Sequence, residues 1–181
     1  MKRLFFSLLA ACSFAVASAQ PVTDASVIIS RLQLDNVILL IPPVDFVQAH
    51  FDDAGDYFNP SGRVLEDIFG NETSPFLVFS NRNFNVAIKS ATANFAYLGS
   101  GSGNNVMPCS VLQYSLVSNG TGGTNATPST WNGLSTSTAP LITGGTYGAA
   151  RPFGLKLRAK PGWSYTGGTY FLDVIVTATQ L

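Results

Sequence analysis

The acidic residues between positions 50 and 62 form the densest group of potential ligands in this 181-residue chain. The segment reads HFDDAGDYFNPSG and carries Asp52, Asp53, Asp56 and Asn59. Calcium takes about six to eight oxygen ligands, and closely spaced Asp and Asn residues on a glycine-containing loop supply several of them. The spacing lacks the regular acidic alternation and the distant glutamate of an EF-hand loop. We therefore expect a surface turn in which these side chains bond the local backbone, with a calcium site as the alternative.

The remaining reactive residues do not form a catalytic pattern. His50 is the single histidine, and no Gly-x-Ser-x-Gly elbow accompanies it to present a nucleophile. His50 and Cys109 lack the ligand spacing of a zinc site. Glu66 and Asp67 are adjacent, so their side chains diverge on a strand or on a helix, and they do not form a carboxylate pair. We expect no enzymatic activity, no catalytic residues and no cofactor.

Three aromatic residues support a binding hypothesis. Trp131, Trp163 and Tyr165 lie in or beside segments of loop composition. Exposed aromatic rings stack on sugar rings in carbohydrate-binding β domains, so these three are candidates for a polysaccharide site. The alternative is that Trp163 and Tyr165, within KPGWSYTGG, pack over the end of the domain.

The elements that must position these residues are β-strands. Alternating apolar and polar residues occur in three segments, 84–90, 111–118 and 153–160, which is typical of antiparallel strands with one face on a core. The predicted inward residues are Phe84, Val86 and Ile88; Leu112, Tyr114 and Leu116; and Phe153, Leu155, Leu157 and Ala159.

Further segments complete a predicted all-β domain. Residues 26–34 and 36–41 are apolar and β-branched, and 100–105 and 118–130 have the composition of loops. Residues 63–69 are the one place where we expect a short helix. Strands without intervening helices predict a single antiparallel β-sandwich over residues 20–181, of immunoglobulin-like or pilin-like Greek-key topology.

The tetrapeptide GGTY occurs twice, at 144–147 and 167–170. Paired glycines suit a turn and Thr-Tyr suits a strand, and only the second copy continues into a strand-like run. From Thr169 onward, one face of that run is apolar. If the strand lies at a sheet edge, its unpaired backbone groups are a template for another chain, and the apolar segment 27–34 is the candidate donor. The candidate assembly residues are Gly168, Tyr170, Leu172, Val174 and Val176.

The first residues predict export. Lys2 and Arg3 precede an apolar run over 4–16, and Ala-Ser-Ala at 17–19 is a cleavage site, so residues 1–19 read as a signal peptide. The apolar run is shorter than the about 20 residues of a membrane span, and we expect no transmembrane segment. Leu-Ala-Ala-Cys12 offers a lipobox as the alternative. We expect the protein in the periplasm, on the outer cell surface or outside the cell.

Removal of the signal peptide sets the charge and cysteine content. It leaves eight basic residues against ten acidic ones, a net charge of about −2. This charge lacks the positive excess that is typical of nucleic-acid-binding proteins, so we expect no nucleic-acid partner. Cys109 is then alone, as a small buried hydrophobe or, alternatively, as half of an intermolecular disulfide.

The order of these parts resembles a known group of proteins. DYFNPSG (56–62) is followed by FNVAIKSATANF (84–95), MPCSVLQYSLV (107–117) and GGTYFLDVIVTAT (167–179). This order resembles the bacterial secreted β-sandwich group that contains the spore coat protein U and fimbrial-subunit-like domains, and it is similar to uncharacterised surface domains of Bacteroidota. Gly168 matches the glycine that opens the last strand of fimbrial subunits, whereas Gln180 stands where they carry an aromatic residue.

The resemblance implies a structural or adhesive protein of the cell surface. Its expected partners are further copies of itself, other surface proteins, or a polysaccharide. The alternative function is a carbohydrate-binding module that uses the loop aromatics, and a hydrolytic enzyme is the third reading.

Overall fold

The computed structural model describes residues 31–42, 46–127 and 130–181 of the chain. The chain divides into two units, Met1–Leu34 and Asp35–Leu181, and every helix and strand described lies in the second. In the first unit, the described residues 31–34 belong to no helix or strand, and both leucines among them are exposed.

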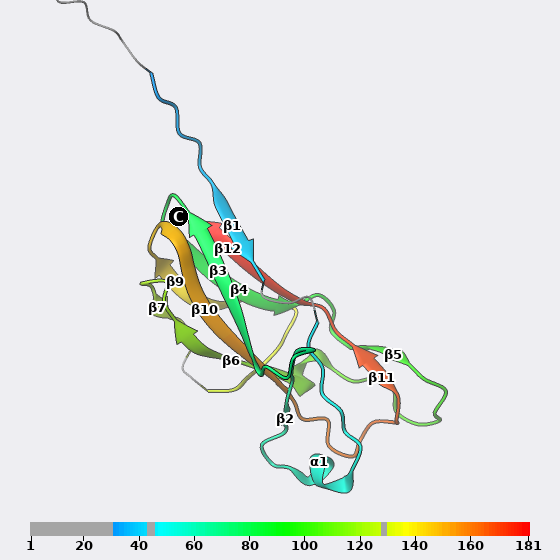
Figure 1. The fold of residues 1–181 in the computed structure, drawn as a ribbon. Coiled ribbons are helices and arrows are strands. Elements are labelled where there is room, and N and C mark those ends of the chain that lie inside the picture. The colour runs from blue at the N-terminus through cyan, green and yellow to red at the C-terminus, as the bar shows by residue number, and fades with distance from the viewer. Residues whose placement is uncertain (1–30, 43–45, 128–129) are drawn as a thin grey trace, which may run out of the picture. The chain divides into compact units, whose positions relative to one another are not determined.

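The larger sheet has six strands, all paired antiparallel (Figure 1). Its order is β1-β3-β10-β6-β8, and β2 pairs with the end of β10. The bounds are β1 (Ile38–Ile41), β2 (Arg63–Val64), β3 (Thr73–Ser80), β6 (Leu112–Asn119), β8 (Asn132–Gly133) and β10 (Gly148–Ala159).

The second sheet has the order β12-β4-β9-β7, and a separate two-stranded ribbon joins β11 to β5. These pairs are antiparallel as well. The bounds are β4 (Phe84–Ser90), β5 (Ala96–Leu98), β7 (Thr124–Asn125), β9 (Ala139–Gly145), β11 (Thr169–Phe171) and β12 (Val174–Gln180). A single turn of helix, α1 (Ala54–Phe58), and a 3-10 turn, η1 (Cys109–Val111), are the helical elements described.

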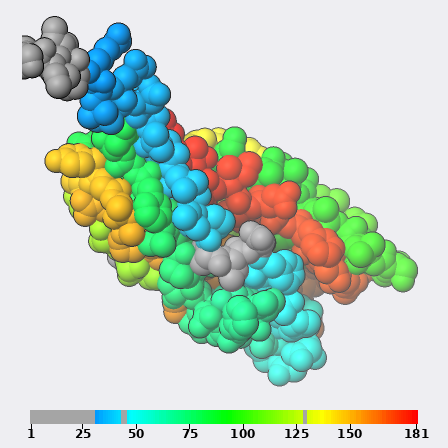
Figure 2. Space-filling model, turned by 45° about the horizontal axis from the view of Figure 1, so that its top comes forward, coloured from blue at the N-terminus to red at the C-terminus, as the bar shows by residue number. Residues whose placement is uncertain are grey.

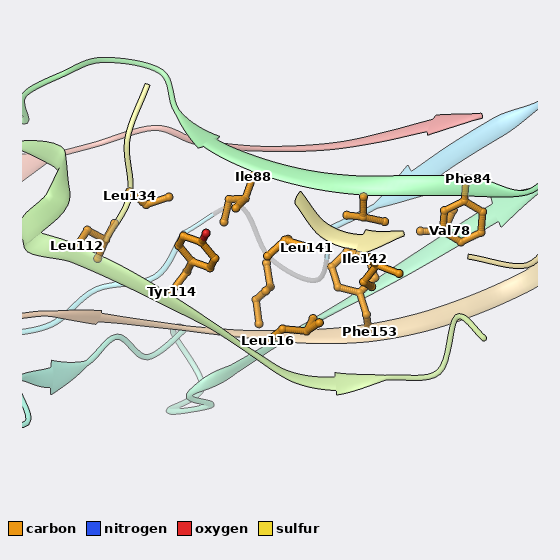
Figure 3. Close-up of a cluster of buried hydrophobic side chains, with 12 residues drawn as sticks. Val78, Phe84, Ile88, Leu112, Tyr114, Leu116, Leu134, Leu141, Ile142 and Phe153 are labelled. Carbon is orange, nitrogen blue, oxygen red and sulfur yellow. The ribbon is translucent and has the colours of Figure 1, made fainter. Parts of the chain in front are cut away.

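The hydrophobic core lies between the two sheets (Figure 3). β6 contributes Leu112, Tyr114 and Leu116, which face Ile88 of β4 and Leu141 of β9 across the gap. The remaining buried members of the cluster are Val78, Phe84, Val86, Leu134, Ile142, Phe153 and Leu155. Side chains of successive strand residues alternate between faces, so each sheet buries one row and leaves the other at the surface.

The predicted inward rows are confirmed. Every second residue of β4 is buried, and the predicted inward residues of β6 are buried too. In β10, Phe153 and Leu155 are buried, and Leu157 and Ala159 are partly buried against the core. The all-β prediction is therefore correct. Cys109 is buried, in agreement with its reading as a small hydrophobe.

The helix predicted over 63–69 is wrong. Residues 63–64 form β2, and Glu66 forms a β-bridge with Gln48. Asp67 then ends the extended run, because its carboxylate accepts the backbone N–H groups of Phe69 and Asn71 and holds them in a turn. The helix lies earlier, at α1, where Asp53 caps it by accepting the N–H of Asp56 at 3.0 Å.

The prediction that 118–130 is wholly loop is also wrong in part, since β6 extends to Asn119 and β7 occupies Thr124–Asn125. Two strands, β3 and β9, were not predicted, and each contains a proline, which normally argues against a strand. Pro75 is tolerated because β1 covers only Leu77–Ser80 of β3, so no donor is required at Pro75 on that side. Pro140 of β9 likewise lies outside the stretch that pairs with β7.

The two GGTY copies serve different positions. The first closes β9, where Gly144 has a φ of 65°, and the turn through Tyr147 leads into β10. The second precedes β11, as predicted, but the expected continuous strand is divided: Leu172 and Asp173 separate β11 from β12.

Several predictions fall outside the described residues. They are the signal peptide over 1–19, the lipobox cysteine Cys12, and the first half of the donor segment 27–34. Throughout residues 31–42, 46–127 and 130–181, no helix is long and apolar enough to cross a membrane.

Candidate functional site

An apolar groove of about 980 Å³ runs between two segments that are distant in sequence. One rim is formed by residues between Leu40 and Phe51, and the other by residues between Tyr165 and Val176. The floor consists of core-facing side chains from both sheets: Phe76, Ile88, Leu112, Leu155 and Leu157. A volume near 1,000 Å³ is at the upper end of small-ligand sites.

The predicted assembly residues lie along this groove. Tyr170, Leu172, Val174 and Val176 all line it, and Gly168 lies at the same rim. Burial alternates without a break from Thr169 to Gln180, because these four side chains are partly buried and the intervening ones are exposed. The predicted side chains therefore do lie on one face of the chain, although the strand that carries them is divided into β11 and β12.

β12 lies at the edge of its sheet. It pairs with β4 from Val174↔Ser90 to Gln180↔Phe84, and among the described strands none pairs with its other side. Figure 2 shows β12 (red) beside β1 (blue), and the two strands are in contact without forming a ladder. An edge strand with unpaired backbone N–H and C=O groups is a template for a further strand.

Gln180 lies at the end of β12, outside the residues that line the groove. Its side-chain nitrogen donates to the carbonyl of Val37 at 2.7 Å, and it also contacts Ser80 Oγ at 3.1 Å and Asn81 Oδ1 at 3.0 Å. This residue occupies the position where the resemblance expects an aromatic side chain. Here it ties the edge of one sheet to the edge of the other.

The opposite rim is an extended strap, residues 46–51, which the sequence analysis did not identify. All of residues 46–51 line the groove, and burial alternates along them: Val47, Ala49 and Phe51 are partly buried, whereas Phe46, Gln48 and His50 are exposed. The alternation of these residues was the available signal. The strap is held by two backbone hydrogen bonds of 2.8 Å between Gln48 and Glu66.

Glycine is needed at position 168 because the Tyr97 ring lies against it, and not because the position lines the groove. Its φ is 155°, and a Cβ there would stand 2.4 Å from the ring of Tyr97. Tyr97 is fixed at this place because its hydroxyl donates to Gly167 O at 3.0 Å and accepts the N–H of Gly101 at 3.2 Å. Close approach of an aromatic ring to the backbone explains the glycine.

The acidic segment forms a capped turn around α1. One carboxylate oxygen from each of Asp52, Asp53 and Asp56 can lie within 4.8 Å of the others, which is the expected clustering. Two of these carboxylates already have partners: Arg63 donates to Asp56 at 2.7 Å and Asp52 N–H donates to Asp56 at 3.2 Å, while Asp53 accepts the N–H of Asp56. Asn59 turns away and accepts the N–H of Ser61.

The electrostatics of this turn follow from those bonds. Desolvation alone raises the pKa of the Asp56 carboxyl, but the hydrogen bonds from Asp52 and Arg63 and the charge of Arg63 together lower it below its ordinary value. The carboxylate is thus stabilised as an anion by the protein itself. The arrangement matches the expected turn, and calcium stays the alternative.

The three aromatic candidates do not form one platform. Trp163 stacks on Tyr57 at 4.6 Å between ring centroids and meets Phe58 at 5.2 Å, above α1. Trp131 instead lies under Arg158, whose guanidinium carbon is 4.4 Å from the ring centroid. Tyr165 lines the groove.

Of these three rings, Trp163 is the one that packs against aromatic neighbours and is also largely exposed to solvent. Trp163 is 59% exposed and Phe58 is 72% exposed, so the pair forms an open aromatic surface on a braced turn. Phe58 was not identified from the sequence, because its role depends on a contact with a residue more than 100 positions away.

Cys109 and His50 are not arranged for chemistry with each other. Cys109 donates to the Leu134 carbonyl at 3.4 Å inside the core, whereas His50 is an exposed residue of the strap. In the described part of the chain, Asp52, Asp53 and Asp56 form the one cluster of three acidic, histidine or cysteine side chains close enough to share a cation.

Comparison with protein-family models and with curated proteins finds no match to this chain.

Proposed function

We propose that the protein is an exported, non-enzymatic β-sandwich subunit of immunoglobulin-like or pilin-like Greek-key topology that self-associates at the cell surface. In this proposal, an apolar N-terminal segment of one copy enters the groove of another and pairs with β12. The observation that carries the proposal is the groove itself, because its wall is the apolar row of an edge strand with a free backbone side.

The sequence of the N-terminal segment suits this role. Residues 27–34 read VIISRLQL, which places Ile28, Ser30, Leu32 and Leu34 on one face of an extended chain, so three of its four side chains are apolar. Leu32 and Leu34 are exposed. Three residues separate Leu34 from β1, and β1 is itself a rim of the groove, so a second copy is the proposed source of the inserted segment.

Deletion tests the proposal, because every described strand lies in Asp35–Leu181. Deleting residues 20–34 is expected to abolish concentration-dependent oligomers in analytical ultracentrifugation and to keep the β-type circular dichroism spectrum. A synthetic peptide of residues 20–34 should then bind the deletion variant. Oligomers that persist after the deletion, or a variant that unfolds, would refute strand insertion.

A matched pair of substitutions tests the position of binding. Val174→Asp places a charge on the groove face of β12 and should weaken peptide binding at least about tenfold. Thr177→Asp lies at an exposed position of the same strand that does not line the groove, and it should leave binding unchanged. Equal effects of the two variants would place the peptide elsewhere.

The open aromatic pair favours a second candidate, a carbohydrate-binding surface formed by Trp163 and Phe58 rather than by Trp131. Retardation in polysaccharide-containing gels tests it. Trp163→Ala is expected to abolish retardation, and Trp131→Ala is expected to keep it, because Trp131 is covered by Arg158. An unretarded native protein across neutral and acidic polysaccharides would reject this candidate.

A further inference from the structure

The outward face of β1 and β3 is apolar, which is unusual for the solvent side of an antiparallel sheet. β1 reads ILLI, so both of its faces are apolar: Ile38 and Leu40 face inward, and Leu39 and Ile41 face outward. Strands that are apolar on both faces normally lie buried on both. Leu39 is nevertheless 52% exposed and Ile41 is 39% exposed.

The apolar face continues across the neighbouring strands. Leu39 stands opposite Phe79 and Ile41 opposite Leu77, and Leu77 stands opposite Pro152 of β10. Figure 2 shows these strands side by side on the surface, β1 in blue, β3 in green and β10 in orange. We call this surface the outer face; its members are Leu39, Ile41, Pro75, Leu77, Phe79 and Pro152.

The size of the outer face is that of a functional patch. Its six side chains, partly or half exposed, present on the order of 300–400 Å², which is within the range of the largest apolar patches on monomers. Stable interfaces bury about 800 Å² from each partner. The outer face is therefore large enough for the apolar centre of such an interface, and the rest of the area would have to come from the surrounding polar residues.

The charges next to the outer face are Glu72 and Arg82 at opposite ends of β3, and Lys156 and Arg158 at the outward positions of β10 beyond Pro152. Glu72 precedes the strand and forms an ion pair with Lys156, and Arg82 follows the strand. Within the outer face itself, the outward positions of β1 and of Pro75–Phe79 carry no charge. Two identical faces can thus cover each other without burying an unpaired charge.

We infer that the outer face is a contact between two copies of this chain, related by a two-fold axis with their β3 strands antiparallel. This symmetry places the Glu72–Lys156 ion pair of one copy near Arg82 of the other, so that Glu72 contacts both cations and orients the pair, while the apolar centre provides the affinity. The contact extends the proposed self-association by a second surface, and it holds whether or not a segment enters the groove.

Sedimentation of the full chain with single substitutions tests the inference. Leu39→Asp places two carboxylates in the two-fold interface and should weaken dimerisation at least about 100-fold. Leu98→Asp is the matched control, because Leu98 is 68% exposed on β5, outside the outer face. A third variant carries both Leu32→Asp and Leu34→Asp, which should prevent strand insertion and leave a dimer held by the outer face alone. Adding Leu39→Asp to that variant should then dissociate the dimer.

Protection of an introduced cysteine from alkylation measures burial of the outer face without the Leu39→Asp variant, which could be destabilised. In the full chain, Leu39→Cys should be alkylated several-fold more slowly as protein concentration rises, whereas Leu98→Cys should react at a constant rate; mass spectrometry of peptides separates both from Cys109. The inference is overturned if Leu39→Cys shows no protection, if Leu39→Asp associates as tightly as Leu98→Asp, or if the Leu32→Asp, Leu34→Asp variant is monomeric at every concentration.

Discussion

Replacing Gly168 by alanine should destabilise the domain for two separable reasons. The backbone φ of 155° is one that residues with a side chain rarely adopt, which costs about 1–3 kcal/mol. The new Cβ would also stand 2.4 Å from Cε2 of Tyr97 and 3.0 Å from its Cζ and hydroxyl oxygen. These distances are too short for contact, so the ring must move.

Movement of the Tyr97 ring has its own cost. The hydroxyl group makes two hydrogen bonds, to Gly167 O and from Gly101 N–H, and each contributes about 0.5–1.5 kcal/mol. Loss of one or both, added to the backbone strain, gives an expected destabilisation of about 2–4 kcal/mol for Gly168→Ala. Urea unfolding followed by circular dichroism measures this free energy directly.

Two other glycines separate the contributions. At Gly162 the φ is 62° but no atom lies within 4 Å of the added Cβ, so Gly162→Ala reports strain alone, about 1 kcal/mol. Gly167 has open space and no positive φ, so Gly167→Ala should change stability by less than about 0.5 kcal/mol.

A double-mutant cycle with Tyr97→Ala tests the contact. Removing the ring should relieve the clash, so that Gly168→Ala costs at least about 1 kcal/mol less in the Tyr97→Ala background. The reasoning is refuted if Gly168→Ala costs no more than Gly162→Ala, or if the cycle shows no coupling.

Trp163→Ala should cost about 1–2 kcal/mol in urea unfolding, because the ring is 59% exposed and loses chiefly its aromatic contacts; a loss of 3–5 kcal/mol would mark it as a core residue. Millimolar calcium should leave the melting temperature unchanged, because Asp56 is held by Arg63; a rise of several degrees that Asp53→Ala removes would contradict this. The side chain and the backbone N–H of Asn71 donate to the Asp67 carboxylate and lower its pKa, so its stabilising effect is present above the unfolded value of about 4 and is lost as pH falls through the folded value. Unfolding measured between about pH 3 and 7 should accordingly show a shallower acid dependence in Asp67→Asn. Intact-mass measurement of the exported protein should give a chain that starts at Gln20, and an acylated Cys12 would overturn this.

Local pattern predicted the inward rows of β4, β6 and β10, because alternation with a period of two assigns each side chain to a face before any partner is known. The same rule predicted the apolar row from Tyr170 to Val176. It failed at 63–69, where the carboxylate of Asp67 bonds the backbone and a turn replaces the expected helix. It also missed β3 and β9, because the cost of a proline depends on whether a neighbouring strand needs its missing N–H.

The sequence by itself thus determined the class of the domain and which side chains face its core, since both follow from the orientation of successive residues. Only the tertiary structure decided where those rows meet. Gln180 contacts Val37 across 143 positions, and Trp163 stacks on Tyr57 instead of joining Trp131. The groove and the outer face likewise exist because strands distant in the chain lie side by side. Their pairing depends on the burial of surfaces contributed by several strands at once, which no single segment encodes.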